Sequence, residues 1–391
     1  MKKLIDYDGK GKCCGCRACE LICPVKAISM EKDEEGFLYP IINKSICVNC
    51  GKCYKTCDFS QRIKKCNPKV PSAFVCVHKN KNVRRQSRSG GVFVAISDYV
   101  LEKGGYVYGV EFADDFSVRH TRAESPQLRN KFCGSKYVQS DTGNSFESVY
   151  IDLTKGGIVL FSGTACQVGG LYKYLSSKGL NEHFYNNLIT CDIVCHGVVS
   201  PKIWADNLQY IENKFNAKIL SANFRDKSFG WNSHIESYYI NNETITNTLY
   251  TSIFYEHVAL RPSCYNCPYT STEREADITL ADAWGIAKKI PAWDDDLGHS
   301  LVLVNTVKGH KIFSKILTDI ESVEVKLLDF MQPNLVNPTS QPKNREVFCN
   351  AYRKRGYVYV ARKCKKRQMK IKKWNQIKSL VVKALRKLRL K

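Results

Sequence analysis

The sequence predicts three parts in order along its 391 residues: a small cysteine-rich α+β module, an α/β body and a basic amphipathic helix at the C-terminus. Three observations predict this arrangement. Eight cysteines near the N-terminus repeat at one set of intervals, short apolar runs alternate with helical patterns from residue 72, and residues 353–391 hold 17 Lys and Arg but no Asp or Glu. The chain has room for several domains, since domains typically run about 100–200 residues.

The composition is that of a globular protein, with 43% hydrophobic and 25% charged residues. The N-terminal segment is too polar for a signal peptide, and no later segment approaches the ~20 apolar residues that cross a bilayer. The 19 cysteines are clustered in a way that indicates metal in a reducing compartment, so we expect a cytoplasmic protein. The formal charge is +23, but residues 1–352 carry 43 basic against 37 acidic residues. Nucleic-acid binding by the main domains is therefore not expected.

A repeated four-cysteine run is the first chemical motif. Its first copy, C-x2-C-x2-C-x3-C followed by Pro24, contains Cys13, Cys16, Cys19 and Cys23, and its second contains Cys47, Cys50, Cys53 and Cys57. This spacing is typical of bacterial ferredoxins with two 4Fe-4S clusters, in which the fourth cysteine of each run ligates the other cluster. We therefore expect one cluster on Cys13, Cys16, Cys19 and Cys57, and a second on Cys47, Cys50, Cys53 and Cys23.

Two structural zinc sites are the alternative for these cysteines, since C-x2-C pairs also bind zinc. The complete repeat and Pro24 favour clusters, so residues 1–66 are expected to form an α+β ferredoxin-type 4Fe-4S dicluster domain. Cys14 and Cys66 fall outside the repeat and are expected to be ordinary unligated cysteines. Asp58 stands where a proline is common, which matters little because proline is not a ligand.

The segment after Pro71 has the alternation of apolar and helical patterns that is typical of an α/β body. Apolar runs predict strands at residues 74–77, 106–112, 158–161, 188–194, 276–281 and 300–305. Helical periodicity predicts helices over Val92–Leu101, Ala165–Leu175, Pro201–Phe215 and Lys311–Ile320. The third of these has a good start, with Ser200 as the N-cap and Pro201 in the first turn.

Two strand-to-helix turns have the composition of anion sites, because backbone N–H groups at a helix start attract negative charge. One is SRSGGVF, with Ser89, Gly90 and Gly91, and the other is FSGTACQ, with Gly163 and Thr164. The alternative is that each is simply a helix start with small residues.

Six motifs in this order resemble the coenzyme F420 hydrogenase/dehydrogenase beta-subunit family. They are SRSGGVF, GSKYVQSD, LFSGTACQVGGL, CDIVCHGVVSPKIW, RPSCYNC and ADITLADAWGI. The resemblance covers residues from about 72 to about 320 and implies a domain of the family's N-terminal type at 67–150 and one of its C-terminal type at 151–345.

The resemblance implies an oxidoreductase with bound FAD. The matching positions for flavin binding are Ser87, Ser89, Gly90, Gly91, Lys136, Tyr137, Gly163 and Thr164. A flavin accepts a two-electron hydride and releases single electrons to clusters, which a cluster cannot do alone. No catalytic residue is assigned, and the substrate, including coenzyme F420 itself, stays open.

The family also suggests a third 4Fe-4S cluster in the body. Cys264 and Cys267 form a C-x2-C pair and Cys195 lies in the CHGVVSP motif, with Cys166 or Cys191 as the fourth thiolate. The alternative is that these are buried apolar cysteines. Cys166 could alternatively be a reactive thiol, because it lies in the first turn of a predicted helix. His196 could be a proton donor or a structural residue.

The C-terminal segment, residues 346–391, predicts a basic amphipathic helix. Its apolar positions recur at intervals of three and four residues: Ile371, Trp374, Ile377, Leu380, Val381, Ala384, Leu385 and Leu388. Such helices lie on anionic membrane surfaces. The alternative is that these apolar positions pack on the body or on a partner protein. Binding of nucleic acid is the third interpretation, because no base-reading motif is present.

These features predict a cytoplasmic iron-sulfur flavoprotein, peripheral on the inner face of the cell membrane if the tail binds lipid. Electrons would pass between a redox partner, such as a ferredoxin or a partner enzyme, the clusters and FAD. A pathway that builds sugars or envelope polymers would suit a membrane-bound enzyme. The alternatives are a non-catalytic electron-transfer subunit without flavin and a redox-sensing scaffold. A bound flavin with turnover distinguishes the first interpretation.

Overall fold

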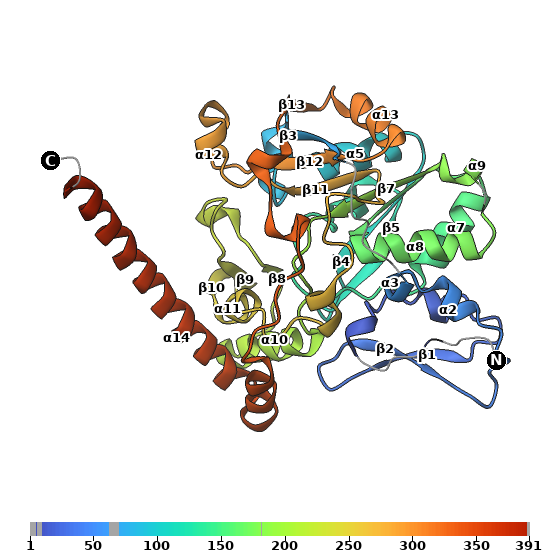
Figure 1. The fold of residues 1–391 in the computed structure, drawn as a ribbon, viewed down its shortest axis with the longest axis horizontal. Coiled ribbons are helices and arrows are strands. Elements are labelled where there is room, and N and C mark those ends of the chain that lie inside the picture. Colours follow the sequence, from blue (N-terminus) through green and yellow to red (C-terminus); the bar gives the residue numbers. More distant parts are fainter. Residues whose placement is uncertain (1–4, 6–9, 62–69, 181, 389–391) are drawn as a thin grey trace.

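The structure, a computed structural model, describes residues 5, 10–61, 70–180 and 182–388, with side chains of the last helix up to Trp374. It contains a small N-terminal module, a body built on one large sheet, and a second lobe from which a long helix projects (Figure 1). Cys66 and residues 389–391 lie outside the described residues.

The N-terminal module is a two-stranded antiparallel hairpin with short helices on either side. Its elements are η1 (Lys10–Lys12), α1 (Ala18–Leu21), β1 (Ile28–Lys32), β2 (Leu38–Ile42), α2 (Lys52–Thr56) and α3 (Asp58–Gln61). Gly15 and Gly51 adopt left-handed backbone angles (φ 74° each) within the two cysteine runs, which glycine allows at little cost. Each run therefore folds as a tight loop that turns its cysteines inward.

The body is built on an eight-stranded mixed sheet with the order β13-β3-β12-β11-β7-β6-β4-β5. Its strands are β3 (Ser72–His78), β4 (Tyr106–Phe112), β5 (Val118–Ala123), β6 (Val159–Thr164), β7 (Leu188–Ile193), β11 (Ile278–Asp282), β12 (Ser300–Val304) and β13 (Ile320–Glu324). The six predicted strands are confirmed within a few residues. Strands β4, β6, β7 and β11 run parallel, and β3 has the same direction because β12 is antiparallel to both β11 and β3.

Helices cover both faces of this sheet and give the predicted α/β arrangement. One face is packed by α5 (Val92–Leu101) and α13 (Val307–Ile316), and the other by α7 (Ser145–Thr154) and α8 (Ala165–Ser177). Helix α5 has the predicted bounds, whereas α13 begins and ends four residues before the predicted Lys311–Ile320. Ile320 instead starts β13, where it pairs with His78 of β3. The shorter elements are α4 (Lys81–Gln86), α6 (Pro126–Asn130), α9 (Glu182–Tyr185), α12 (Ile286–Lys289), η4 (Pro291–Trp293), η5 (Leu327–Phe330) and η6 (Pro333–Leu335).

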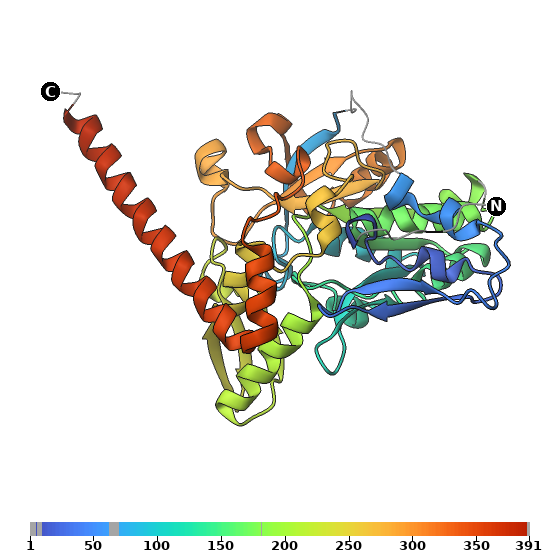
Figure 2. The same ribbon diagram turned by 60° about the horizontal axis from the view of Figure 1, so that its bottom comes forward.

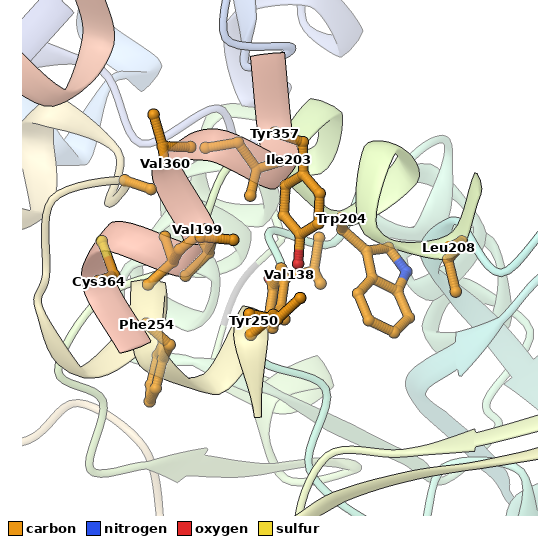
Figure 3. Packing of buried hydrophobic residues seen from close by; sticks show 14 of the residues in the cluster. Val138, Val199, Ile203, Trp204, Leu208, Tyr250, Phe254, Tyr357, Val360 and Cys364 are labelled. Atoms are coloured by element: carbon orange, nitrogen blue, oxygen red, sulfur yellow. The ribbon is translucent and has the colours of Figure 1, made fainter. Parts of the chain in front are cut away.

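The second lobe has its own hydrophobic core, which Figure 3 shows. It combines a three-stranded sheet with helices, and its elements are α10 (Pro201–Phe215), β8 (Ser221–Asn223), η2 (Lys227–Phe229), β9 (Glu236–Ile240), β10 (Glu243–Asn247), α11 (Leu249–Tyr255), η3 (Pro262–Asn266) and α14 (Arg345–Leu388). Trp204 of α10 and Tyr250 of α11 are buried there beside Tyr357 and Val360 of α14. Helix α10 has the predicted bounds, and Ser200 caps it by accepting from the backbone N–H of Ile203.

Helix α14 has two roles along its length. It bends at Gly356, the non-helical residue within it, and then packs Tyr357, Val360, Ala361 and Cys364 into the second lobe. Beyond this it extends away from the body on the side opposite to the N-terminal module (Figures 1 and 2). Ile371 and Trp374 of the predicted stripe are 45% and 66% exposed, and the side chains of the later stripe residues lie outside the described ones. In the described part of the chain, no helix is both long enough and apolar enough to cross a bilayer.

Candidate functional site

The first candidate site is a pocket in the N-terminal module lined by Cys23, Cys47, Cys50 and Cys53. These are the four cysteines expected for the second cluster, so the fold brings the last cysteine of run one to the first three of run two. Pro24, Ile28 and Ile42 complete an apolar lining. We refer to these four cysteines as the outer set, because Cys23, Cys47 and Cys50 are all partly exposed.

The cysteines expected for the first cluster lie deeper, where the module meets the body. Cys13 and Cys19 are buried, and Cys16 and Cys57 are near enough to Cys13 to affect its charge. Burial raises the pKa of the Cys13 thiol to about 11. Cys13, Cys16, Cys19 and Cys57 are called the inner set. Burial opposes a bare thiolate here, so iron would supply the compensating charge.

Helix α8 of the body packs directly against the inner set. A Cβ at Gly170 would lie 2.9 Å from Cys16 Sγ, and one at Gly169 would lie 2.6 Å from the Tyr269 hydroxyl oxygen and 2.9 Å from Asp58 Oδ2. Asp58, at the position where proline is common, accepts a 2.6 Å hydrogen bond from Tyr269. The two glycines therefore permit the module to approach the body more closely than any other residue would allow.

The body cysteines form a third set around one pocket. It is lined by Cys14, Cys166, Cys195, Cys264 and Cys267, and it encloses about 590 Å³ including space open to solvent. Cys191, the other candidate for a fourth thiolate, is instead buried in the sheet core on β7. Burial raises the pKa of Cys195 to about 11 and that of Cys267 to about 12. We refer to Cys166, Cys195, Cys264 and Cys267 as the body set. No three His, Cys, Asp or Glu side chains of the described residues converge closely enough to bind a single metal ion.

Cys14 joins the inner set to the body set. Its side chain packs against those of Cys16 and Cys166. The neighbouring Cys14 thiol lowers the pKa of Cys166 to about 7 against the effect of burial, and the Thr164 hydroxyl, 3.1 Å from Cys166 Sγ, acts in the same direction. Cys14 falls outside the repeat and was expected to be an ordinary unligated cysteine, and the structure places it between a member of the inner set and a member of the body set.

Arg261 is a buried cation at the same junction. It is 1% exposed, and it donates to the Cys13 carbonyl oxygen at 2.7 Å, to the Leu38 carbonyl oxygen at 2.8 Å and to Gln139 Oε1 at 2.8 Å. A further N–H group lies 3.5 Å from Cys13 Sγ. Tyr39 lies under the guanidinium at 4.2 Å. Among the described residues, no carboxylate forms an ion pair with this arginine.

The residues expected for flavin binding lie along one edge of the sheet, where the parallel strands end. Ser87, Ser89, Gly90 and Gly91 follow β3 and α4, Gly163 and Thr164 end β6, and Lys136, next to Tyr137, lies over the ring of Phe112 at the end of β4. Ligands of α/β proteins bind at this edge in general. Gly90 is required there, since a Cβ would lie 2.2 Å from the Cys76 carbonyl oxygen.

The expected flavin residues do not form one continuous patch. Thr164 lines the cysteine pocket and is the cap of α8, where its hydroxyl and backbone N–H both interact with Gln167 Oε1. Lys136 donates to the carbonyl oxygens of Lys131 and Cys133, and burial lowers its pKa to about 8. Tyr137 stacks on Phe254 at 4.5 Å and accepts a 3.3 Å hydrogen bond from Arg225. The Thr164 turn thus has the geometry of an ordinary capped helix start.

Basic residues that were not predicted from the sequence connect these groups. Arg88, inside the SRSGG motif, donates to the carbonyl oxygens of Arg225 and Trp231, each at 2.6 Å. Arg225 forms an ion pair with Asp282 at 2.7 Å and lies over the Trp284 ring. Burial, with the nearby Arg88 and Arg84, lowers the pKa of Lys227 to about 7. In the sequence, Arg88 within the SRSGG motif is the residue that could have indicated this basic group.

Several buried donors of this region lack a hydrogen-bond partner among the described residues. They are Arg84 Nε, Ser87 Oγ, Arg88 Nε, Arg225 Nε, Trp231 Nε1 and His299 Nδ1. Buried donors are normally paired, so an unpaired group calls for a ligand or water. An anionic group with several acceptor oxygens, such as the pyrophosphate of a dinucleotide, would satisfy such donors.

His196 packs against Phe254 and His257. The centres of the His196 and Phe254 rings are 4.7 Å apart, and burial lowers the pKa of His196 to about 4. A neutral, packed imidazole matches the structural interpretation of His196 better than that of a proton donor.

Two segments of the chain match known protein families. Residues 157–327 match the family described as the C terminus of the beta subunit of coenzyme F420 hydrogenase/dehydrogenase, and residues 12–60 match the 4Fe-4S dicluster domain. A similar solved fold is a chain of the F420-reducing [NiFe] hydrogenase complex from Methanosarcina barkeri, studied by xenon derivatization. It has a TM-score of 0.50 and 18% identity, over 74% of this chain and 95% of that chain. No curated protein matches the chain.

Proposed function

Because residues 157–327 belong to the coenzyme F420 hydrogenase/dehydrogenase beta-subunit family and residues 12–60 form a 4Fe-4S dicluster domain, we propose that the chain is an iron-sulfur flavoprotein oxidoreductase. The dicluster domain makes it an iron-sulfur electron-transfer protein. The proposal adds that its electrons reach FAD bound in the body. The single observation that carries it is the pair of cysteine-lined pockets, one in the module and one at the sheet edge of the body, with Cys14 packed against Cys16 and Cys166 between them.

The outer set would hold one cluster and the inner set another, with the fourth cysteine of each run exchanged. The body set would hold a third cluster, for which Cys166 is better placed than Cys191. Cys14 supports this order, because it touches both Cys16 and Cys166. Electron transfer falls off steeply with distance, so adjacent sites favour a relay between the module and the body.

FAD would lie along the edge that carries SRSGG, with the unpaired donors of Arg88, Arg225 and Trp231 toward its acceptor oxygens. A bound flavin exchanges a hydride with an organic substrate and single electrons with clusters. Arg88, which forms no ion pair among the described residues, would supply positive charge to its phosphates, while Arg84 and Arg225 are already paired with Asp295 and Asp282. The Trp284 ring under Arg225 closes one side of this region. The hydride donor or acceptor is left open.

The test is anaerobic purification with assays of iron, sulfide and flavin released by acid. We expect about one FAD per chain beside full cluster content. Arg88→Ala and Arg225→Ala should each lose flavin while retaining iron, whereas Arg85→Ala, on the exposed side of the same segment, should retain both. Full clusters without flavin, even after incubation with FAD, would reject the flavoenzyme in favour of an electron-transfer subunit without flavin.

The projecting part of α14 would rest on an anionic membrane surface, so that the protein is peripheral on the inner face. Its support is the exposure of Ile371 and Trp374 among many lysines and arginines. An enzyme held there would suit substrates such as lipid-linked sugars of envelope polymers. Co-sedimentation with phosphatidylglycerol vesicles tests the tail. Deletion of residues 368–391 should abolish it, while undiminished binding of the truncated chain would reject the tail as the anchor.

A further inference from the structure

The surface above the outer set combines exposed apolar side chains with lysines. Val25 and Val48 line the outer pocket and are 38% and 60% exposed, and Ile46, next to Cys47, is 48% exposed. Lys52 also lines this pocket, Lys26 and Lys44 lie within two residues of Val25 and Ile46 in the chain, Lys55 lies on α2 with Lys52, and all four lysines are exposed. We call these seven residues the lysine collar. Exposed apolar groups beside a site commonly mark a binding surface.

The collar carries one sign of charge. Residues 21–30 and 36–57 contain its four lysines and no Asp or Glu. Among the described acidic residues of the module, Glu20 pairs with Arg17 and Asp58 accepts a hydrogen bond from Tyr269, while Glu31 lies in β1 and the other three lie in the turn between β1 and β2. There Asp33 and Glu34 pair with Lys10, and Glu35 pairs with Arg345 of α14. In the described part of the chain, none of the four lysines forms an ion pair, so their charge faces solvent.

The collar lies at the outer set, so a partner bound to the collar would face that set of cysteines. The inner set is packed against α8 and Arg261, and the cysteines of the body set, which are partly exposed, line a separate pocket. The outer set is partly exposed, and Val25, Val48 and Lys52 of the collar line its pocket directly. Figure 1 shows the module at the side of the body opposite to the projecting helix, so that helix does not cover it.

We propose that the lysine collar is the docking site of a small acidic electron-carrier protein, whose redox centre lies under a surface ringed by carboxylates. The proposal rests on the proposed occupancy of the outer set by a 4Fe-4S cluster. Docking transfers one electron. The carrier loses it, the outer cluster gains it, and neither a proton nor a bond change accompanies the step.

Charge complementarity identifies the occupant. A uniformly positive rim attracts a negative partner and raises its association rate about 10- to 1000-fold at low salt. Val25, Ile46 and Val48 would form the dry centre of the contact, with the lysines as its polar rim. Electron-transfer complexes bury little surface, so a patch of seven residues is in keeping with such a contact.

The collar variant is Lys26→Glu with Lys44→Glu and Lys52→Glu. The matched control changes three exposed lysines of the body by the same charge, Lys155→Glu with Lys311→Glu and Lys315→Glu. Iron and sulfide are assayed first in all three proteins. Stopped-flow mixing without oxygen then follows the loss of visible cluster absorption with two reductants, reduced plant-type ferredoxin and reduced methyl viologen.

We expect the second-order rate with ferredoxin to fall at least tenfold in the collar variant and to lose its dependence on salt. The control variant should react like the wild type, and the viologen rate should not fall in either. An equal loss in both variants, or none, would overturn the docking site. The docking site would also be overturned if methyl viologen reduced the wild-type protein and ferredoxin did not. If methyl viologen also failed to reduce the wild-type protein, both the proposed function and the docking site would be overturned.

Discussion

The guanidinium of Arg261 lies between the module and the body, where its nearest potential counter-charges are thiols. Cys13, Cys14 and Cys264 all act on its charge, as does Tyr39. A buried charge without a partner costs several kcal/mol of stability, so buried charges in proteins are usually paired. Loaded clusters are anionic, and they would give Arg261 the partner that the described residues lack.

Arg261→Gln should therefore lower the midpoint potential of the inner cluster, because the reduced cluster loses a nearby positive charge. A unit charge several Å away is worth about 2–3 kcal/mol at an effective dielectric constant of about 20, which is on the order of 100 mV for one electron. EPR-monitored redox titration measures the shift. Arg261→Lys keeps the charge and should stay near the wild-type potential. Equal potentials in wild type and Arg261→Gln would contradict the prediction.

His120 is a buried imidazole stacked on Phe161, with 5.4 Å between the ring centres. Burial lowers its pKa to about 4. The unfolded chain takes up a proton near pH 6.5, whereas the folded one does so only near pH 4. Stability is therefore lost as the pH falls through this window, at up to about 1.4 kcal/mol per pH unit.

His120→Phe should flatten the acid side of the stability curve. Thermal unfolding followed by circular dichroism between pH 4.5 and 7.5 measures it. His310→Phe is the control, since that histidine is exposed. A melting temperature that falls equally steeply in wild type and His120→Phe would show that this imidazole does not contribute.

At the scale of elements, α8 decides how the module is held. Helices α1, α2 and α3 all contact it, and Arg17 forms an ion pair with Asp141 beside this contact. Glycine within a helix costs about 1 kcal/mol relative to alanine. Gly169 and Gly170 therefore stand where close packing has outweighed helix propensity.

Gly170→Ala should weaken the contact, although it favours the helix. Its methyl group would overlap Cys16 Sγ, and such overpacking typically costs about 1–3 kcal/mol. We expect faster loss of iron to a chelator and a lower melting temperature. Lys173→Ala, on the exposed side of α8, should change neither. If Gly170→Ala were instead more stable than the wild type, as expected for a glycine in an uncrowded helix, Cys16 would not lie as close to α8 as the structure shows.

At the scale of the whole molecule, the module depends on its clusters more than the body does. Its small core consists of Ile5, Cys19, Ile28 and Cys53, and two of these four are cysteines of the cluster sets. The body and the second lobe have large apolar cores of their own. Small domains with few buried residues usually need metal to fold.

Removal of iron should therefore unfold the module selectively. Limited proteolysis with mass spectrometry should find new cuts within residues 10–61 of the iron-free protein, while fragments of the body persist. The holoprotein, treated in parallel, is the control. Identical cleavage of both forms would mean that packing against α8 and the Glu35–Arg345 ion pair hold the module without iron.

The sequence by itself determined the cysteine runs, six strands of the large sheet and the bounds of α5 and α10, because each depends on local spacing or periodicity. It missed the second lobe, since β8 has three residues and β10 is mostly exposed, and neither gives an apolar pattern. The first turns of α14 also enter the core of that lobe, where Tyr357 and Val360 are buried.

Only the tertiary structure decided which cysteines meet. Cys14 and Cys166 are far apart in the chain, and so are Cys13 and Arg261, whose positions differ by 248 residues. The choice of Cys166 over Cys191 is of the same kind. One thiol begins a helix at the sheet edge, while the other points into the sheet core from a strand. Residue spacing records contacts within one element, whereas these contacts arise from the packing of separate elements.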